Sequence, residues 1–167
     1  WKSFHLYDIF QIDAGTKLDK GKMDTTIPKV NFVGRSNFNN GITQKVNEIQ
    51  GLKPYEVGNL TLALGGAYLG SCFIQEEPFY TSQNVAVLIP KNNITFDAKQ
   101  FIATAIFIES QNNYRAFIKE LNTHIKRDFA IKLPAKSNGE PDYEYMTEYI
   151  KRIKQKSSHT IDVIKHI

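Results

Sequence analysis

Hydrophobic positions in the first 90 residues follow the alternation or the short apolar runs of β-strands. IPKVNFVG (27–34) alternates apolar and polar side chains and predicts a strand. Asn40-Gly41 predicts a tight turn because both residues tolerate positive φ, and GITQKV then returns as the second strand of a hairpin. VGNLTLALGG (57–66) and SCFIQ (71–75) predict a second strand pair. The nearly continuous apolar run NVAVLIP (84–90) is typical of an inner strand.

The rest of the chain, nearly half of it, changes mostly to helical spacing. DAKQFIATAIFIES (97–110) has apolar residues three and four positions apart, with Asp97 as the expected N-cap. NNYRAFIKELNTHIK (112–126) predicts a second helix with Tyr114, Phe117, Ile118, Leu121 and Ile125 on its apolar face. FAIKLP (129–134) predicts a short final strand.

A long amphipathic helix is predicted after the break at Gly139 and Pro141, with Asp142 as its cap. Its apolar positions recur at steps of three and four residues: Met146, Tyr149, Ile150, Ile153, Thr160, Ile161, Ile164 and Ile167. The sequence therefore predicts an α/β (α+β) fold with a mixed, largely antiparallel twisted sheet and packed helices. Residues 1–138 form the expected domain, and residues 139–167 begin a coiled-coil-type helix.

Composition narrows the classes of protein. With 167 residues, 41% of them hydrophobic and 23% charged, the chain can build one globular core. No stretch reaches the roughly 18 consecutive apolar residues of a membrane helix, and WKSFHLYDIF does not resemble a signal peptide. We expect a piece of a cytoplasmic chain without a membrane partner, in which the single Cys72 is a small buried residue.

The net charge of +4 comes entirely from the last third of the chain. Residues 1–110 hold ten Lys or Arg and ten Asp or Glu, whereas residues 111–167 hold eleven and seven. This balance agrees with a polyanionic partner and equally with an ordinary solvated surface.

Catalytic and metal-binding patterns are not found. Pro141-Asp142 is followed by acidic residues on a predicted helix, and Lys151 stands three residues after Glu148, which does not fit the strand-borne PD…ExK pattern of nucleases. The four histidines do not have metal-ligand spacing, and GGAYLG (65–70) lacks the features of a nucleotide-binding loop. The methyltransferase signature Asn/Asp-Pro-Pro-aromatic is also absent. We expect no enzyme activity, no metal and no cofactor.

Two loops instead have the side chains that read bases in DNA, namely amides and a guanidinium group. The candidate DNA-binding residues are Arg35, Ser36, Asn37, Asn39, Asn40 and Lys45 around the first hairpin, and Tyr80, Thr81, Ser82, Gln83 and Asn84 before the inner strand. Asn and Ser also form turns in their own right, so a purely structural role stays open.

The order of these segments resembles a target recognition domain of a restriction-modification specificity subunit, of the type I or type IIB/IIG kind. The resemblance covers nearly the whole chain and rests on these segments: WKSFHLYDIFQIDAG, VNFVGRSNFNNGI, GNLTLALGGAYLGSCFIQEEPFYTSQNVAVLIP and IKLPAKSNGEPDYEYMTEYI. It implies a non-catalytic α/β domain that reads double-stranded DNA, followed by a helix that pairs with another in an antiparallel coiled coil.

The resemblance also implies partners. Methyltransferase subunits would supply S-adenosylmethionine and the chemistry, and a restriction or translocase subunit can join them. The predicted partner-helix residues are Met146, Tyr149, Ile150, Ile153, Ile161 and Ile164. A full type I subunit contains two recognition domains, so the resemblance implies that this chain is one of three things: a half-subunit that dimerises, a fragment, or the tail of a fused enzyme. The alternative function is a protein-interaction module that docks through its C-terminal helix without reading bases.

Overall fold

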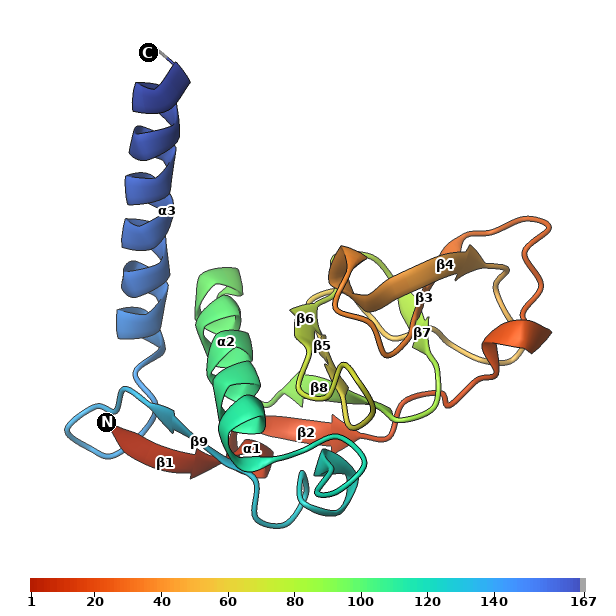
Figure 1. Cartoon of the computed structure of the whole chain (residues 1–167), viewed down its shortest axis with the longest axis horizontal. Helices are drawn as coiled ribbons and strands as arrows, with labels where there is room; N and C mark the ends of the chain where they lie inside the picture. Colours follow the sequence, from red (N-terminus) through yellow and green to blue (C-terminus); the bar gives the residue numbers. More distant parts are fainter. Residues whose placement is uncertain (166–167) are drawn as a thin grey trace.

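The computed structural model describes the backbone of residues 1–165 and the side chains of residues 1–158 (Figure 1). Its elements are, in chain order, β1 (Lys2–His5), α1 (Leu6–Ile9), β2 (Phe10–Asp13), η1 (Lys20–Lys22), β3 (Val30–Val33), η2 (Asn39–Gly41), β4 (Ile42–Val46), β5 (Leu60–Ala63), β6 (Cys72–Ile74), β7 (Phe79–Thr81), β8 (Val85–Pro90), α2 (Phe96–Asn113), η3 (Leu121–Thr123), β9 (Ala130–Leu133) and α3 (Tyr143–Lys165).

Over residues 1–165 the strands divide among three small sheets rather than one. β1 pairs with β9, four strands follow in the order β2-β8-β5-β6, and three follow in the order β4-β3-β7. All of these pairings are antiparallel except that of β3 with β7. The predicted hairpin of 27–46, the strand pair 57–75 and the inner position of 84–90 are confirmed, as is the mixed, largely antiparallel fold class.

The first hairpin turns where the sequence predicted it. Asn39, Asn40 and Gly41 have φ values of 46°, 52° and 77°, a left-handed conformation that Asn and Gly adopt more readily than other residues. The turn leads directly into β4 and sets its register against β3, with Val30 opposite Val46. The local sequence therefore accounts for the position of this turn.

The largest hydrophobic core lies among α2, the four-stranded sheet and the β1–β9 sheet, and includes Phe10, Leu62, Leu88, Ile102 and Phe129. A smaller core of Val30, Phe32, Val46 and Tyr80 belongs to the three-stranded sheet. Neighbouring side chains of a strand point to opposite faces, so Val33 packs away from Phe32. It belongs to a third cluster, with Phe79 of β7 and Val85 and Val87 of β8, that joins the three-stranded sheet to the four-stranded sheet.

Helix α2 begins two residues earlier than a cap at Asp97 requires. The Thr95 hydroxyl accepts the hydrogen bond of the Ala98 N–H at 3.1 Å, so Thr95 is the N-cap and the prediction of Asp97 was wrong. Asp97 lies in the first turn, where its charge is favourable near the positive end of the helix. The buried face consists of Ala98, Ile102, Ile106 and Ser110.

The second helix predicted for residues 112–126 does not form. The chain leaves α2 at Asn113, and Phe117 adopts a φ of 65°, which no right-handed helix contains. Tyr114, Leu121 and Ile125 are buried as the pattern required, but Phe117 and Ile118 are exposed. A loop with one 3₁₀ turn, η3, thus places the buried members of the pattern in the core.

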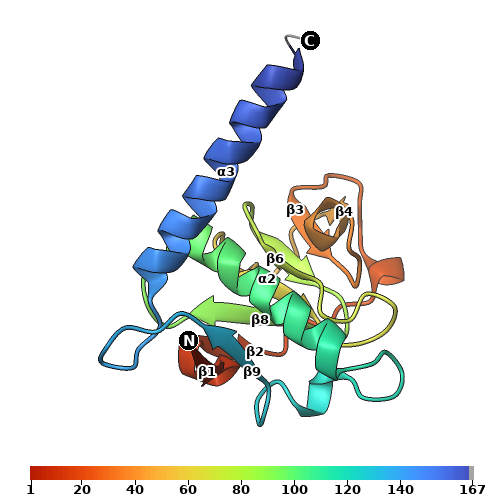
Figure 2. The same cartoon turned by 60° about the vertical axis from the view of Figure 1, so that its left-hand side comes forward.

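The third helix starts as predicted, because the Asp142 side chain accepts the hydrogen bond of the Tyr145 N–H at 3.0 Å. Its base packs on α2: Met146 is fully buried, and the Tyr149 ring meets the Phe101 ring edge-on at 5.5 Å. Lys154 pairs with Asp97 at 2.5 Å. Beyond this base α3 projects from the body (Figures 1 and 2).

Over residues 1–165 no helix has both the length and the apolar character to cross a membrane.

Candidate functional site

The parallel pairing of β3 with β7 brings the two predicted loops together. Val33 lies opposite Thr81, and the Ser82 N–H donates to the Val33 carbonyl at 2.8 Å. Parallel strands end at the same edge of a sheet, so the loop after β3 (residues 34–41) and the loop after β7 (residues 82–84) leave side by side. The sequence suggested both loops, but their proximity follows from the tertiary structure.

Two further loops join this edge. The Leu64 N–H donates to the Asn84 carbonyl at 2.9 Å, and the Leu121 N–H donates to the Leu64 carbonyl at 2.9 Å. Residues 64–70 and 114–120 therefore continue the row, and we call residues 34–41, 64–70, 82–84 and 114–120 the four-loop edge. In Figure 1 it runs between the three-stranded sheet and the C-terminal end of α2, and α3 projects on the other side of α2.

Most of the predicted residues of the first loop are accessible. Arg35, Asn37, Asn39 and Asn40 are exposed and Ser36 is partly exposed, with its hydroxyl accepting the Phe38 N–H at 3.1 Å. Asn39 has a second task, because its side-chain amide donates to the Ile42 carbonyl at 3.3 Å across the turn. Lys45 lies farther along β4 and pairs with Glu77 at 2.7 Å. Both partners are about half exposed, so the pair is worth only about 0–1 kcal/mol and is readily exchanged for another anion.

Tyr80 and Thr81 do not belong to the accessible surface. Both are fully buried, and the Tyr80 hydroxyl donates to the Leu52 carbonyl at 2.7 Å and accepts the Ile49 N–H at 3.1 Å. Thr81 is bound to Thr16 through hydroxyl and backbone groups of both residues. The prediction that these two side chains contact DNA was wrong, because their polar atoms hold the loops 49–52 and 14–18 onto β7.

The other three residues of that segment remain on the surface. Gln83 and Asn84 are exposed, Ser82 is partly exposed, and Asn84 turns the chain into β8 with a φ of 57°. Their backbone is fixed on both sides, by Val33 and by Leu64. Gln83 is thus the exposed amide at the centre of a rigid turn.

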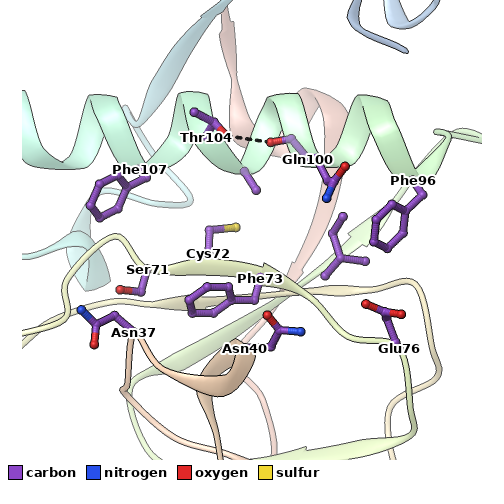
Figure 3. Close-up of a pocket in the computed structure, with 12 residues that line it drawn as sticks. Asn37, Asn40, Ser71, Cys72, Phe73, Glu76, Phe96, Gln100, Thr104 and Phe107 are labelled. Atoms are coloured by element: carbon purple, nitrogen blue, oxygen red, sulfur yellow. Dashed lines mark hydrogen bonds between the residues drawn. The ribbon is translucent and has the colours of Figure 1, made fainter. Parts of the chain in front are cut away.

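A hollow of about 460 Å³ lies where the hairpin tip faces α2 (Figure 3). Asn37 and Asn40 line one side of it, Cys72 and Phe73 of β6 form its floor, and Phe96, Gln100 and Phe107 of α2 lie opposite. Burial raises the pKa of the Cys72 thiol, so the thiol is protonated at neutral pH and contributes an apolar surface. The hollow therefore combines amides with aromatic rings.

Glu120 organises the far end of the four-loop edge. Its carboxylate accepts the Gly66 N–H at 2.8 Å and the Phe117 N–H at 3.0 Å, so it ties residues 64–70 to residues 114–120. These backbone hydrogen bonds lower the pKa of the Glu120 carboxyl, with a smaller contribution from the charge of Arg35. A Cβ at Gly66 would come within 3.1 Å of the Arg35 guanidinium, which shows how closely the first loop approaches.

The NMR chemical shifts of the Gly66 and Phe117 amide protons should therefore change together as the Glu120 carboxyl titrates, at a pH below the ordinary glutamate pKa of about 4.3. A lowered folded-state pKa means that the carboxylate stabilises the loops above the unfolded-state pKa and loses this effect as pH falls through the folded-state pKa. Glu120→Gln should abolish the common titration, and Glu140→Gln, at an exposed position outside the edge, should leave it unchanged. Titration at the ordinary pKa would contradict this assignment.

Among the residues that the structure describes, no group of three or more His, Cys, Asp or Glu side chains could hold a metal ion. The four-loop edge also exposes residues that the sequence did not single out as DNA-binding, namely Tyr68 of GGAYLG and Arg115, Phe117, Ile118 and Lys119 of the loop 114–120. An apolar pair between two cations was the available signal. The spacing of these residues also fits a helix face, so the sequence predicts a helix there instead of an exposed tip.

The apolar face of α3 borders a groove at the other side of the molecule. The groove measures about 1000 Å³ and is lined by Trp1, Phe101, Ile108, Tyr149 and Ile153, together with Ile150 and polar neighbours. Of the predicted partner-helix residues, Met146 is instead buried in the core, Tyr149 and Ile153 are about 40% and 44% exposed, and Ile150 is partly exposed. The side chains of Ile161 and Ile164 lie outside the described residues.

Comparison with known proteins relates this arrangement to a family. Residues 1–166 match the family described as Type I restriction modification DNA specificity domain. The chain is 30% identical over 163 residues to the specificity subunit S.BcgI of the Type II restriction enzyme BgcI from Heyndrickxia coagulans, and the match covers 93% of this chain and 44% of that protein. The chain therefore spans less than half the length of this relative.

Solved structures agree in fold. The type I restriction-modification S subunit from M. genitalium superposes with a TM-score of 0.63 at 14% identity, over 99% of this chain and 42% of that one. A chain of a type I R-M system, solved to describe complex assembly and conformational transition, superposes with a TM-score of 0.66 at 15% identity, over 96% and 40%.

Proposed function

The chain belongs to the Type I restriction modification DNA specificity domain family, and on that premise we propose that it is a target recognition domain whose four-loop edge reads a duplex. The observation that supports this most directly is the convergence of Arg35, Asn37 and Gln83, which are exposed and come from loops joined at one edge. An arginine fork matches a guanine edge, and an amide matches an adenine edge. Both pairings are bidentate, and each discriminates against the wrong base by about 1–3 kcal/mol.

The alternative of a protein-interaction module without base reading is not favoured, since the relatives are named specificity subunits. Lys45 on β4 would add a phosphate contact by releasing Glu77. Each phosphate neutralised by a cation makes the affinity more sensitive to salt. Binding by this domain should accordingly weaken steeply as salt is added.

The domain would carry no chemistry of its own. Methyltransferase subunits would bind S-adenosylmethionine and modify the base, and a restriction or translocase subunit would join the same complex. In this proposal the domain positions these subunits on DNA, which places its work in the cytoplasm. Its own contribution is the choice of site.

The second surface, along α3, would connect the domain to the rest of the assembly. Residues 1–138 would form the recognition body and residues 139–167 the start of a spacer helix. Tyr149, Ile150 and Ile153 leave an apolar groove beside α2 that a second amphipathic helix fits. Because the chain spans 44% of its relative S.BcgI, that helix would come from a second recognition domain in a longer polypeptide or from a second copy of the chain.

Arg35→Ala combined with Asn37→Ala tests base reading. Asn37 is the better choice than Asn39, whose side chain also holds the turn. In the assembled methyltransferase complex, each lost bidentate contact should reduce discrimination at one base pair by about 1–3 kcal/mol, or about 5- to 150-fold. Sequencing of methylated positions in host DNA should then show a relaxed target.

The matched control is Arg127→Ala with Asn93→Ala, since both residues are exposed and lie outside the four-loop edge. This variant should methylate the original target alone. If the Arg35 and Asn37 variant also kept the original target without relaxation, the first loop would not be a reading surface.

A further inference from the structure

The tip of the last loop exposes two large apolar side chains. Phe117 is 82% exposed and Ile118 is 81% exposed, more than any other large apolar side chain among the described residues. Neither contributes to a hydrophobic core of the fold. Water contact of this much apolar surface is unfavourable in the isolated chain, so the tip has no folding role that accounts for its composition.

The backbone of the tip is also costly to build. Phe117 has a φ of 65°, a left-handed conformation that is uncommon for a bulky residue and destabilises the fold. The loop is nevertheless held firmly, because the backbones of Arg115 and Lys119 exchange hydrogen bonds at 3.0 and 2.9 Å. Glu120 adds the hydrogen bond from the Phe117 N–H. The two apolar side chains are thus presented on a rigid turn.

The surroundings of the tip favour a polyanion. Arg115 and Lys119 flank it in sequence and are exposed, and Lys119 lies over the Tyr114 ring at 4.6 Å. Through Glu120 and Gly66 the tip is continuous with Arg35 and the first loop. Two side chains are too small a patch for a stable protein interface, which buries at least about 1,000 Å².

We propose that Phe117 and Ile118 form a wedge that enters the minor groove of the bound duplex and partly unstacks a base step beside the site read by the Arg35 loop. The inference rests on the proposed function and deepens it. The minor groove, about 6 Å wide, admits a narrow turn but no helix. Apolar wedges flanked by cations bend DNA toward the major groove and widen the surface that a protein contacts.

The test uses the full specificity polypeptide that contains this chain, assembled with its methyltransferase subunits, and a duplex carrying the target found by sequencing of methylated DNA. 2-Aminopurine is placed at successive positions in and beside the target, and a second duplex carries a fluorophore at each end. The wild-type complex should raise 2-aminopurine fluorescence at one base step and shorten the distance between the ends. Unrelated duplex should show neither effect.

The variant Phe117→Asn with Ile118→Ser removes the wedge and keeps the loop, because Asn tolerates positive φ. It should melt at or above the wild-type temperature, assemble normally and methylate the same sequence. Its affinity for the target should fall about 10-fold, because the contacts that the wedge and the bent duplex add outweigh the few kcal/mol that unstacking one step costs. Both fluorescence signals should disappear, and the slope of log affinity against log salt should not change, because no charge is lost.

Arg115→Ala with Lys119→Ala should reduce that slope by about 2, one for each cation that contacts a phosphate. Ile27→Ser, at a 66% exposed residue outside the four-loop edge, is the control and should alter none of these readings. The wedge is refuted if Phe117→Asn with Ile118→Ser keeps wild-type affinity and bending, or if it prevents assembly with the methyltransferase, which would make the tip a protein contact. If the wild-type complex bound the target duplex no more tightly than the unrelated duplex, the proposed function itself would be refuted.

Discussion

Met146→Ala is expected to lower the free energy of unfolding by about 2–5 kcal/mol, the usual range for a buried Met whose side chain is truncated. Met146 is fully buried and belongs to the main core, although it lies in the first turns of α3. The lost volume opens a cavity between α3 and α2, next to the hydroxyl contact of Thr147 with Thr95 at 2.7 Å. Denaturant titration followed by circular dichroism measures the change.

Met146→Leu, which conserves volume, should cost less than about 1.5 kcal/mol. The helix itself should persist in Met146→Ala, since Ala has the highest helix propensity of all residues. A loss below about 1 kcal/mol in Met146→Ala would mean that the base of α3 is not anchored in the core, and that the direction in which the helix leaves is not fixed by packing.

Ile153→Asp should instead leave stability within about 0.5 kcal/mol, as most surface changes do, and weaken assembly through α3 by about 100-fold or more. The reason is that Ile153 is 44% exposed in this chain but lines the groove proposed for a second helix. Helix pairing would bury the new carboxylate without a partner, which costs several kcal/mol. Sedimentation of the full specificity polypeptide with its methyltransferase subunits measures the assembly.

Gln155→Asp is the control for Ile153→Asp, because it introduces the same charge on an exposed residue of the same helix that does not line the groove. It should assemble like wild type. Equal assembly of both variants would argue against the groove as the seat of a partner helix, whereas loss of folding in Ile153→Asp would place Ile153 in the core.

The two variants separate two tasks of α3. Residues 146–154 fix the helix to α2 through Met146, the Tyr149–Phe101 contact and the Lys154–Asp97 ion pair. The apolar side chains left open beside α2 would then receive another helix at a set angle. The four-loop edge and the α3 groove lie on different sides of α2, so the domain could hold DNA and its partners at the same time.

Local patterns were sufficient wherever the determining interactions lie close in sequence. The first hairpin follows from positive φ at Asn40-Gly41, and the start of α3 follows from the cap at Asp142. The pattern failed for residues 112–126, since a spacing of three and four residues also fits a loop whose buried members reach the same core. There long-range contacts hold the chain in a loop, among them the hydrogen bonds from Gly66 to Glu120 and from Leu121 to Leu64.

In the candidate site, too, local sequence indicates which loops carry amides, and long-range contacts determine which of their side chains are exposed. Sequence composition identified the first loop, but it could not separate Tyr80 and Thr81, which are buried, from Gln83 and Asn84, which are exposed. Burial of a polar side chain depends on whether distant groups satisfy it, here Leu52, Ile49 and Thr16.

The sequence by itself determined the first hairpin and its turn, the inner strand of residues 84–90, the cap at Asp142, the long amphipathic helix and the supply of amides on loops, because each depends on residues within a few positions of one another. Only the tertiary structure decided which loops share an edge, since the parallel pairing of β3 with β7 joins segments almost fifty residues apart. It also decided that Phe117 and Ile118 face outward and Met146 faces inward. Contacts between distant segments, rather than local periodicity, determine which apolar side chains the core has room to bury.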